Sequence, residues 1–196
     1  MKKNTIILLS ILGVIVLVFI WGNGRYNSMV TADEQVGQSW ANVESQYQRR
    51  ADLIPNLVET VKGYATHENK TFTEVVEARA KATQVTVDPT NITPEKMAEF
   101  QAAQSQVGSA IGRLLVSVEQ YPNLKANQNF LELQAQLEGT ENRISVERQR
   151  FNDAAQAYNV MIRRFPSNII AGLLNFEKKV YFQSEAGSEK APAVKF

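Results

Sequence analysis

A long uncharged run near the N-terminus constrains this chain more than any other feature. Residues 5–22 read TIILLSILGVIVLVFIWG, 18 positions without a charge. A helix of that length rises about 27 Å, close to the roughly 30 Å thickness of a bilayer's hydrocarbon core. The sequence therefore predicts one membrane-spanning helix at 5–22, preceded by a short tail at 1–4.

The charges around this run indicate its orientation. Lys2 and Lys3 precede it, whereas only Arg25 follows closely before Asp33 and Glu34. Positive residues favour the cytoplasmic side, so we expect the N-terminus inside and the soluble domain on the outer side. The charge difference is small and the tail is short, so the opposite orientation stays open. A cleaved signal peptide is another alternative, but the exit sequence FIWGNG lacks the small-x-small pattern of a cleavage site.

The composition argues against several classes of function. The chain of 196 residues has no cysteine, a single histidine (His67) and a formal net charge of +1. Without cysteine there is no disulfide, no thiolate metal site and no thiol nucleophile. A nearly neutral chain also lacks the electric field that attracts nucleic acid. We expect no nucleic-acid partner.

Beyond the membrane run, apolar side chains recur at alternating spacings of three and four residues, the pattern of a coiled-coil-like helix seam. The first seam comprises Tyr26, Met29, Val36, Trp40, Val43, Tyr47, Ile54, Leu57, Val61 and Tyr64. Asp33 and Arg50 interrupt it. Pro55 lies inside it with no capping residue directly before it, so we expect a kink rather than a break. Gly63 and the polar residues around His67 are expected to end this helix.

Three further helices are predicted. Thr71 and Glu74 form a capping-box signature that predicts a short helix to about residue 83. Thr93 and Pro94 predict the start of a third helix, which Pro122 closes. The third seam comprises Met97, Phe100, Gln104, Val107, Ile111, Leu114, Val118 and Tyr121. The fourth comprises Phe130, Leu133, Leu137, Thr140, Ile144, Glu147, Phe151, Ala154, Tyr158, Met161 and Phe165.

Helix lengths indicate how these elements fit together. At about 1.5 Å per residue, the first and fourth helices are each roughly 60 Å long. The third helix is about 40 Å long, and the second helix together with its extended loop spans about the same length. The two ascending helices together are as long as the two descending segments. This match predicts that residues 23–183 form an all-α domain, a long antiparallel up-down four-helix bundle. Its membrane-proximal end would contain mainly the first and fourth helices.

The C-terminal part is expected to cover that thin end. Residues 167–176 (SNIIAGLLNF) are apolar and predict a short helix packed on the bundle. The alternative is a segment lying on the bilayer, with Lys178 and Lys179 toward the headgroups. Residues 184–196 are small and polar, so we expect a flexible tail.

Polar residues within the seams are the first candidates for special roles: Asp33, Arg50, Gln104, Thr140 and Glu147. Arg50 and Glu147 have opposite charges and, on antiparallel helices, fall within a turn or two of the same height. We hypothesise that they form a partly buried ion pair that fixes helix register. Alternatively, both side chains reach solvent at the edge of the seam.

No residue set in the sequence resembles an active site. His67 and Glu68, at a helix end, do not supply the three or four ligands of a zinc-like site. Glu59 and Glu74 have no spacing that would pair them across a cleft. The chain has no glycine-rich phosphate loop and no Gly-x-Ser-x-Gly motif. We therefore expect no catalysis, no metal site and no cofactor.

Several motifs along the chain are specific enough to suggest a relationship. The longest is the stretch 47–68, YQRRADLIPNLVETVKGYATHE. Shorter ones are Arg25-Tyr26-Asn27, Ala78-Arg79-Ala80, Tyr121 to Asn127, Glu141 to Ile144, Phe151-Asn152, Ala157 to Asn159 and the closing Ala191 to Phe196. With these motifs the chain resembles the LemA family over nearly its whole length. Phe151 stands where the family more usually has tyrosine.

The resemblance implies a short N-terminal tail, a single pass through a bacterial cytoplasmic (inner) membrane and a long four-helix domain. It implies no settled biochemical activity. A related family member is associated with magnetosome membranes, and neighbours of family members include membrane metallopeptidases and TPM-domain proteins. These associations suggest a role in membrane organisation or protein quality control.

The polar residues of the matching motifs give a candidate interaction surface. They are Arg49, Arg50, Asp52, Asn56, Glu59, His67, Glu68, Tyr158 and Asn159. A rod built on heptad seams offers side faces rather than pockets, so we predict a membrane-anchored scaffold or adaptor that associates laterally with its own copies or with a membrane protein partner. A solvated helix face is the plainer interpretation. The alternative function is a sensor or ligand-binding module with a cleft between helices near Pro55.

Overall fold

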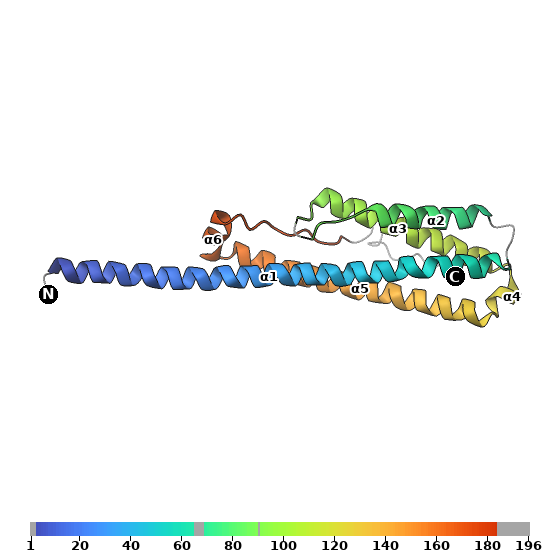
Figure 1. The fold of residues 1–196 in the computed structure, drawn as a ribbon, viewed down its shortest axis with the longest axis horizontal. Helices are drawn as coiled ribbons and strands as arrows, with labels where there is room; N and C mark the ends of the chain where they lie inside the picture. Colours follow the sequence, from blue (N-terminus) through green and yellow to red (C-terminus); the bar gives the residue numbers. More distant parts are fainter. Residues whose placement is uncertain (1–2, 65–68, 90, 184–196) are drawn as a thin grey trace, which may run out of the picture.

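The computed structural model describes residues 3–64, 69–89 and 91–183 (Figure 1). The helices are α1 (Lys3–Lys62), α2 (Asn69–Gln84), α3 (Pro94–Val118), α4 (Pro122–Lys125), α5 (Gln128–Arg163) and α6 (Ser167–Leu173). No strand occurs among the described residues, so the predicted all-α class is confirmed.

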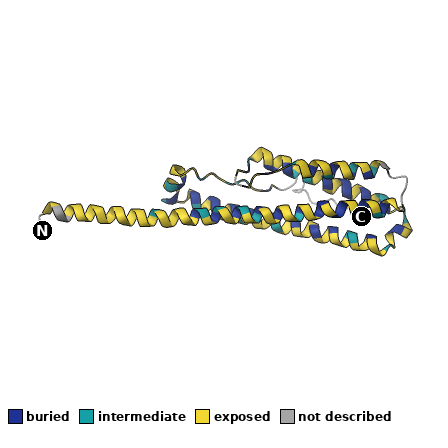
Figure 2. Cartoon of the chain, viewed as in Figure 1, coloured by how far each residue is buried: buried dark blue, intermediate teal, exposed yellow. Residues whose placement is uncertain are grey.

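Helix α1 joins the predicted membrane segment to the first seam without interruption. It runs for 60 residues and continues through Pro55, so the expectation that proline would not break it is confirmed. Its apolar N-terminal part is exposed from Ile7 onward and is long and apolar enough to cross a membrane (Figure 2). At the other end, the Gly63 N–H donates to the Glu59 carbonyl, close to where the sequence predicts the helix to stop.

The helices associate as two antiparallel pairs. Helix α1 packs mainly against α5, and α2 packs mainly against α3 (Figure 1). The α2–α3 pair lies beside the half of α1 that is farther from the N-terminus. Of the first seam, all apolar members between its two end residues are buried, whereas Tyr26 and Tyr64 are exposed. Phe165, which the fourth seam predicts as core, is 82% exposed and lies beyond the end of α5.

Helix starts agree with the sequence at some caps and not at others. The Thr93 hydroxyl accepts from the Lys96 N–H at 3.2 Å and caps α3 as predicted. Helix α2 begins at Asn69, ahead of Thr71, so the predicted start at the capping-box signature is wrong. Helix α3 ends at Val118, and Pro122 opens the short α4 instead of closing α3.

The apolar core is divided into two clusters. One surrounds Ile54, Leu57 and Leu114 in the half far from the N-terminus. The other surrounds Trp40 and Phe151 in the half nearer the predicted membrane segment. The second cluster is formed by α1, α5 and the start of α3, and it is completed by Val87 and Ile92 of the α2–α3 connection, by α6 and by residues after α6.

Helix α6 and an extended segment cover this thinner half. Helix α6 packs against α5 and α1 and buries Ser167 and Ala171, so the predicted short covering helix is confirmed, although it ends at Leu173. Residues 174–183, which we call the strap, then run back along the bundle toward the α2–α3 pair (Figure 1). The strap has no regular secondary structure, yet its Phe182 is buried.

Candidate functional site

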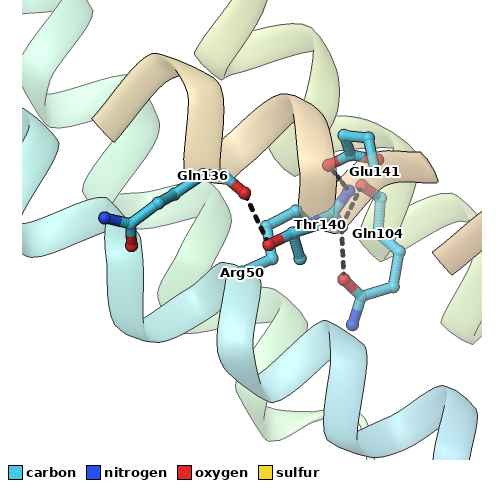
Figure 3. Close-up of polar contacts among 5 residues, drawn as sticks. All are labelled: Arg50, Gln104, Gln136, Thr140 and Glu141. Carbon is cyan, nitrogen blue, oxygen red and sulfur yellow. Dashed lines mark hydrogen bonds and ion pairs between the residues drawn. The ribbon is translucent and has the colours of Figure 1, made fainter. Parts of the chain in front are cut away.

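A buried arginine stands between the two apolar clusters. Arg50, on α1, is 4% exposed. Its Nη1 donates to Glu141 Oε1 at 2.9 Å, and its Nη2 donates to the backbone oxygen of Gln104 at 2.9 Å and to Gln104 Oε1 at 2.6 Å (Figure 3). The guanidinium carbon lies 5.1 Å from the centre of the Tyr47 ring. One side chain thus links α1, α3 and α5.

Thr140 completes this polar layer without joining the arginine's hydrogen bonds. It is 1% exposed, and its hydroxyl donates to the Gln136 carbonyl of its own helix at 2.7 Å (Figure 3). A buried hydroxyl that is satisfied within its helix avoids the cost of an unpaired donor. The layer therefore separates the two clusters while each of its buried groups has a partner.

The predicted Arg50–Glu147 pair is wrong. Arg50 pairs with Glu141, and Glu147 instead accepts from Arg150 on its own helix at 2.7 Å. Glu141 and Glu147 are six residues apart, or about 9 Å of helix rise, so the register of α5 against α1 decides which carboxylate reaches the arginine. The prediction that Arg50 is buried and bonded to the fourth seam's helix is correct, but the periodicity could not fix its partner.

A polar cleft opens beside Arg50 between α3 and α5. It has a volume of about 340 Å³, and Gln101, Ser105, Glu141 and Arg148 are among the residues that line it. A smaller cavity of about 90 Å³ lies on the α2 side of Arg50. Pro55 lines neither of them, although its neighbour Ile54 lines the smaller cavity, whereas the larger cleft reaches α1 only at Tyr47 and Arg50.

Two asparagines of α5 hold the strap by its backbone. Asn159 Nδ2 donates to the Lys179 carbonyl at 2.8 Å, and the Lys179 N–H donates to Asn159 Oδ1 at 2.9 Å. Asn152 makes the same pair of bonds with Phe182, at 3.1 and 2.8 Å. A side-chain amide offers a donor and an acceptor side by side, as a neighbouring strand would. The two asparagines therefore satisfy an extended segment that has no strand partner.

Side chains of the strap fill two pockets. Phe182 stacks on Trp40 with ring centres 5.7 Å apart and meets Phe151 edge-on at 5.4 Å. Lys179 Nζ lies 2.7 Å from Asp33 Oδ1 and 5.5 Å from the centre of the Tyr158 ring. Asp33, which interrupts the first seam, is thereby explained as the partner of a strap lysine.

Burial raises the pKa of Tyr158 from 10.0 to about 12, and the charges of Asp33 and Glu177 add to the rise. The folded chain therefore keeps the phenol proton in a pH range where the unfolded chain loses it. This contribution to stability is complete below pH 10 and is lost as the pH rises through 12. We expect the advantage of the natural chain over Tyr158→Phe in free energy of unfolding to shrink by about 1.4 kcal/mol per pH unit across that range. Chemical denaturation of both chains from pH 9 upward measures it, and a constant difference would contradict the assignment.

The candidate interaction residues separate into three groups. Arg49, Asp52, Asn56 and Glu59 are exposed on α1, as the prediction requires. Arg50, Tyr158 and Asn159 are buried, so placing them on a lateral surface is wrong. Tyr158 and Asn159 face the strap, which supplies the reason. His67 and Glu68 lie outside the described residues.

Sequence reasoning missed Asn152, Lys179 and Phe182 as partners in one assembly. A signal was present, because an aromatic residue followed by asparagine occurs twice at heptad spacing, at 151–152 and at 158–159. In both pairs the aromatic side chain is in the core and the asparagine holds the strap. Among the described residues no group of three or more histidine or acidic side chains is placed to hold a metal ion.

Known proteins are similar to this chain over most of its length. The family model described as LemA family matches residues 39–196. Magnetosome protein MamQ 2 of Paramagnetospirillum magneticum is 28% identical over 182 residues, covering 84% of this chain and 67% of the relative. Protein LemA of Metamycoplasma hominis is 26% identical over 183 residues, covering 93% of this chain and 80% of the relative. Since the family model spans most of the chain, this protein belongs to the LemA family.

Proposed function

We propose that this chain is a membrane-anchored scaffold or adaptor whose rod associates laterally with further copies or with a membrane protein partner. The observation that carries the proposal is the continuity of α1. One helix of 60 residues leads from an exposed apolar segment into the buried seam of the domain. A rigid connection of this kind holds the rod upright on a bilayer and presents its sides, rather than its tip, to neighbours in the same membrane. The two helix pairs would act there as one four-helix, coiled-coil-like unit.

The position of α6 supports attachment at a bilayer surface. Ile170 lies beside Gly22, where a Cβ atom would come within 3.9 Å of Ile170 Cδ1, so α6 sits level with the end of the predicted membrane segment. Its outward side chains Ile169 and Leu173 are 62% and 80% exposed. They lie four residues apart and form a short apolar stripe on one side of α6. Such a stripe fits the interfacial region of a membrane, so α6 would both pack on the rod and rest on the bilayer.

The exposed face of α1 supports lateral association. Arg49, Asp52, Asn56 and Glu59 follow three-, four- and three-residue spacings, which place them on one side of the helix. This face, which we call the α1 stripe, carries both signs of charge. A mixed polar stripe favours a specific polar partner surface over nonspecific apolar contact.

We also propose a noncatalytic role. The buried charged and polar groups we describe, Arg50, Thr140 and Asn159, are engaged with the protein itself. As an adaptor, the chain would present the α1 stripe to a membrane metallopeptidase or a TPM-domain protein, the partner classes implied by the family resemblance. As a scaffold, it would present the stripe to another copy. MamQ, the relative named a magnetosome protein, fits a role in organising membranes.

Crosslinking the full-length chain in living cells, followed by mild detergent extraction, tests the proposal. We expect a particle larger than one chain or a defined co-purifying membrane protein. Arg49→Glu together with Glu59→Arg should reduce that complex at least several-fold, because these changes reverse charges on the stripe. Glu132→Arg, an equally exposed change on α5, serves as the matched control and should leave the complex intact.

The two forms of the proposal give different results. A large particle containing only this chain supports the scaffold, and a defined partner supports the adaptor. A lone monomer under every condition would contradict both.

The polar cleft beside Arg50 favours a second candidate function, a ligand-binding module. Its volume of about 340 Å³ and its lining by Arg50, Arg148 and Glu141 would suit a small molecule that carries an anionic group. A screen of small carboxylates and phosphates against the purified full-length chain tests it. A true ligand raises the unfolding temperature in the natural chain but not in Arg148→Gln, and no shift with any compound would remove this candidate.

A further inference from the structure

The strap occupies a groove that is built to bind an extended peptide. Asn152 and Asn159 are seven residues apart on α5, about 10.5 Å along the helix axis. The strap residues they hold, Lys179 and Phe182, are three apart, which is about 10 Å in an extended chain. The two spacings match, so the asparagine pair selects an extended backbone whatever the side chains.

Two pockets add a preference for particular side chains. The residue held by Asn159 points its side chain toward the Asp33 carboxylate and the Tyr158 ring, a setting that fits a lysine or arginine. The residue held by Asn152 inserts between Trp40 and Phe151, and the Arg148 guanidinium lies 4.9 Å from the centre of its ring. The groove therefore recognises a cationic residue followed three positions later by an aromatic one.

The connection between the strap and the rest of the chain is short. Helix α6 ends at Leu173, and the first ring contact of the strap is that of Phe176 with Tyr26, at 5.9 Å. Asn175, between them, has φ 56°, in the left-handed region that asparagine enters more easily than most residues. Asn175 is thus the left-handed cap residue of α6, since the Phe176 N–H donates to the Ala171 carbonyl at 2.9 Å. An exchanged segment regains the same contacts in its neighbour, so exchange has a low cost.

We propose that the groove formed by α1, α3 and α5 is a binding site for an extended peptide of the form cationic-x-x-aromatic, and that its occupant in the assembled protein is the strap of a second copy. This inference rests on the proposed lateral association and gives it a mechanism. Copies anchored through α1 in one membrane hold their grooves at the same height. A strap can therefore reach a neighbouring groove by turning sideways at Asn175.

Because the chain has no cysteine, engineered thiols report the exchange directly. At the end of the strap, Gln101 Nε2 on α3 donates to the Gln183 carbonyl at 3.0 Å, an exposed contact outside the two asparagine pairs. Full-length Gln101→Cys with one tag is co-expressed with full-length Gln183→Cys with another, and membranes are treated with a short bis-maleimide. Each chain then has a single thiol, so a crosslink between the two tags places the strap end of one copy within the reagent's reach of the groove edge of another.

We expect the mixed-tag dimer in at least several-fold excess over a control pair in which Gln106→Cys replaces Gln101→Cys. Gln106 is exposed on the same helix but lines the shallow surface that faces α2. Adding Asn152→Ala to both chains should reduce the mixed dimer to the control level. Far-UV circular dichroism of the same chains verifies that they remain folded.

Further measurements on the same membranes distinguish failure of the strap exchange from failure of the scaffold proposal. A mixed dimer at the control level, with efficient internal crosslinking of a chain carrying both Gln101→Cys and Gln183→Cys, would show that each strap stays in its own groove and overturn the exchange. If particle size still shows association, only the strap mechanism fails and the scaffold stands. If the chain is monomeric, both fail. A crosslink from Gln101→Cys to a different protein would overturn the second copy as occupant.

Discussion

Replacing Trp40 with alanine is expected to lower the free energy of unfolding by about 3–5 kcal/mol, the range for deleting a large buried aromatic side chain. Trp40 is 1% exposed and contacts rings from three other segments: Phe100 on α3, Phe151 on α5 and Phe182 on the strap. In the half where α2 is absent, this one side chain occupies the space between the helices and the strap. Its loss would leave a cavity that no neighbouring helix can fill. Guanidinium denaturation of the full-length chain in mild detergent, followed by far-UV circular dichroism, measures the change.

Two variants sharpen this test. Trp40→Phe should cost only about 1–2 kcal/mol, because a ring is kept and the buried indole Nε1 has no hydrogen-bond partner to lose among the described residues. Trp21→Ala is the matched control, since the chain's other tryptophan lies on the exposed segment of α1. It should change the stability of the domain by less than about 0.5 kcal/mol. Equal effects of Trp40→Ala and Trp21→Ala would contradict a central role for Trp40.

Replacing Arg50 with alanine should lower the free energy of unfolding by about 3 kcal/mol. The change removes charge-assisted hydrogen bonds worth about 1.5–3 kcal/mol and the packing of the side-chain stem between the two clusters. The Glu141 side chain is 48% exposed, so it is not left as a buried charge, and this limits the loss. The same denaturation measurement applies. Arg49→Ala, the exposed neighbour, should stay within about 0.5 kcal/mol of the natural chain.

Double-mutant cycles decide which carboxylate Arg50 uses. The cycle of Arg50→Ala with Glu141→Ala should give a coupling energy above about 0.5 kcal/mol, whereas the cycle with Glu147→Ala should give none. Coupling to Glu147 instead would mean that α5 sits six residues away from the register described here. The cycle thus tests the alignment of the two longest helices as well as one ion pair.

The strap gives the proposed lateral association a physical basis. A scaffold made only of helix faces would rely on exposed polar contacts such as the α1 stripe, and exposed ion pairs contribute little to stability. A segment that carries its own backbone hydrogen bonds and an aromatic anchor supplies far more contact per residue. Arg148 links the strap to the polar cleft. It donates to the Gln183 carbonyl at 3.1 Å, and it also lines the cleft beside Arg50.

The periodicity of the sequence predicted the helices and most of the core. Spacings of three and four place apolar residues on one side of a helix whatever the partner, so Val36, Trp40 and Leu114 were assigned to the interior correctly. The uncharged run at 5–22 predicted the exposed apolar segment for the same local reason. Helix starts were predicted less reliably. The predicted start after Thr93 is correct, whereas the predicted start at Thr71 is wrong. Local hydrogen-bonding potential does not determine which of several adjacent polar residues starts a helix.

What the sequence by itself determined is therefore the local structure: which residues are helical, which face of each helix is apolar, and that a long apolar segment precedes the domain. Tertiary structure alone decided the contacts between elements. Arg50 was always a polar residue in an apolar seam, but only the register of α5 selected Glu141 over Glu147. The strap has no periodicity, because an extended segment that pairs with side-chain amides needs no repeating pattern of its own. Its place depends on Asn152 and Asn159 being aligned by a helix formed elsewhere in the chain.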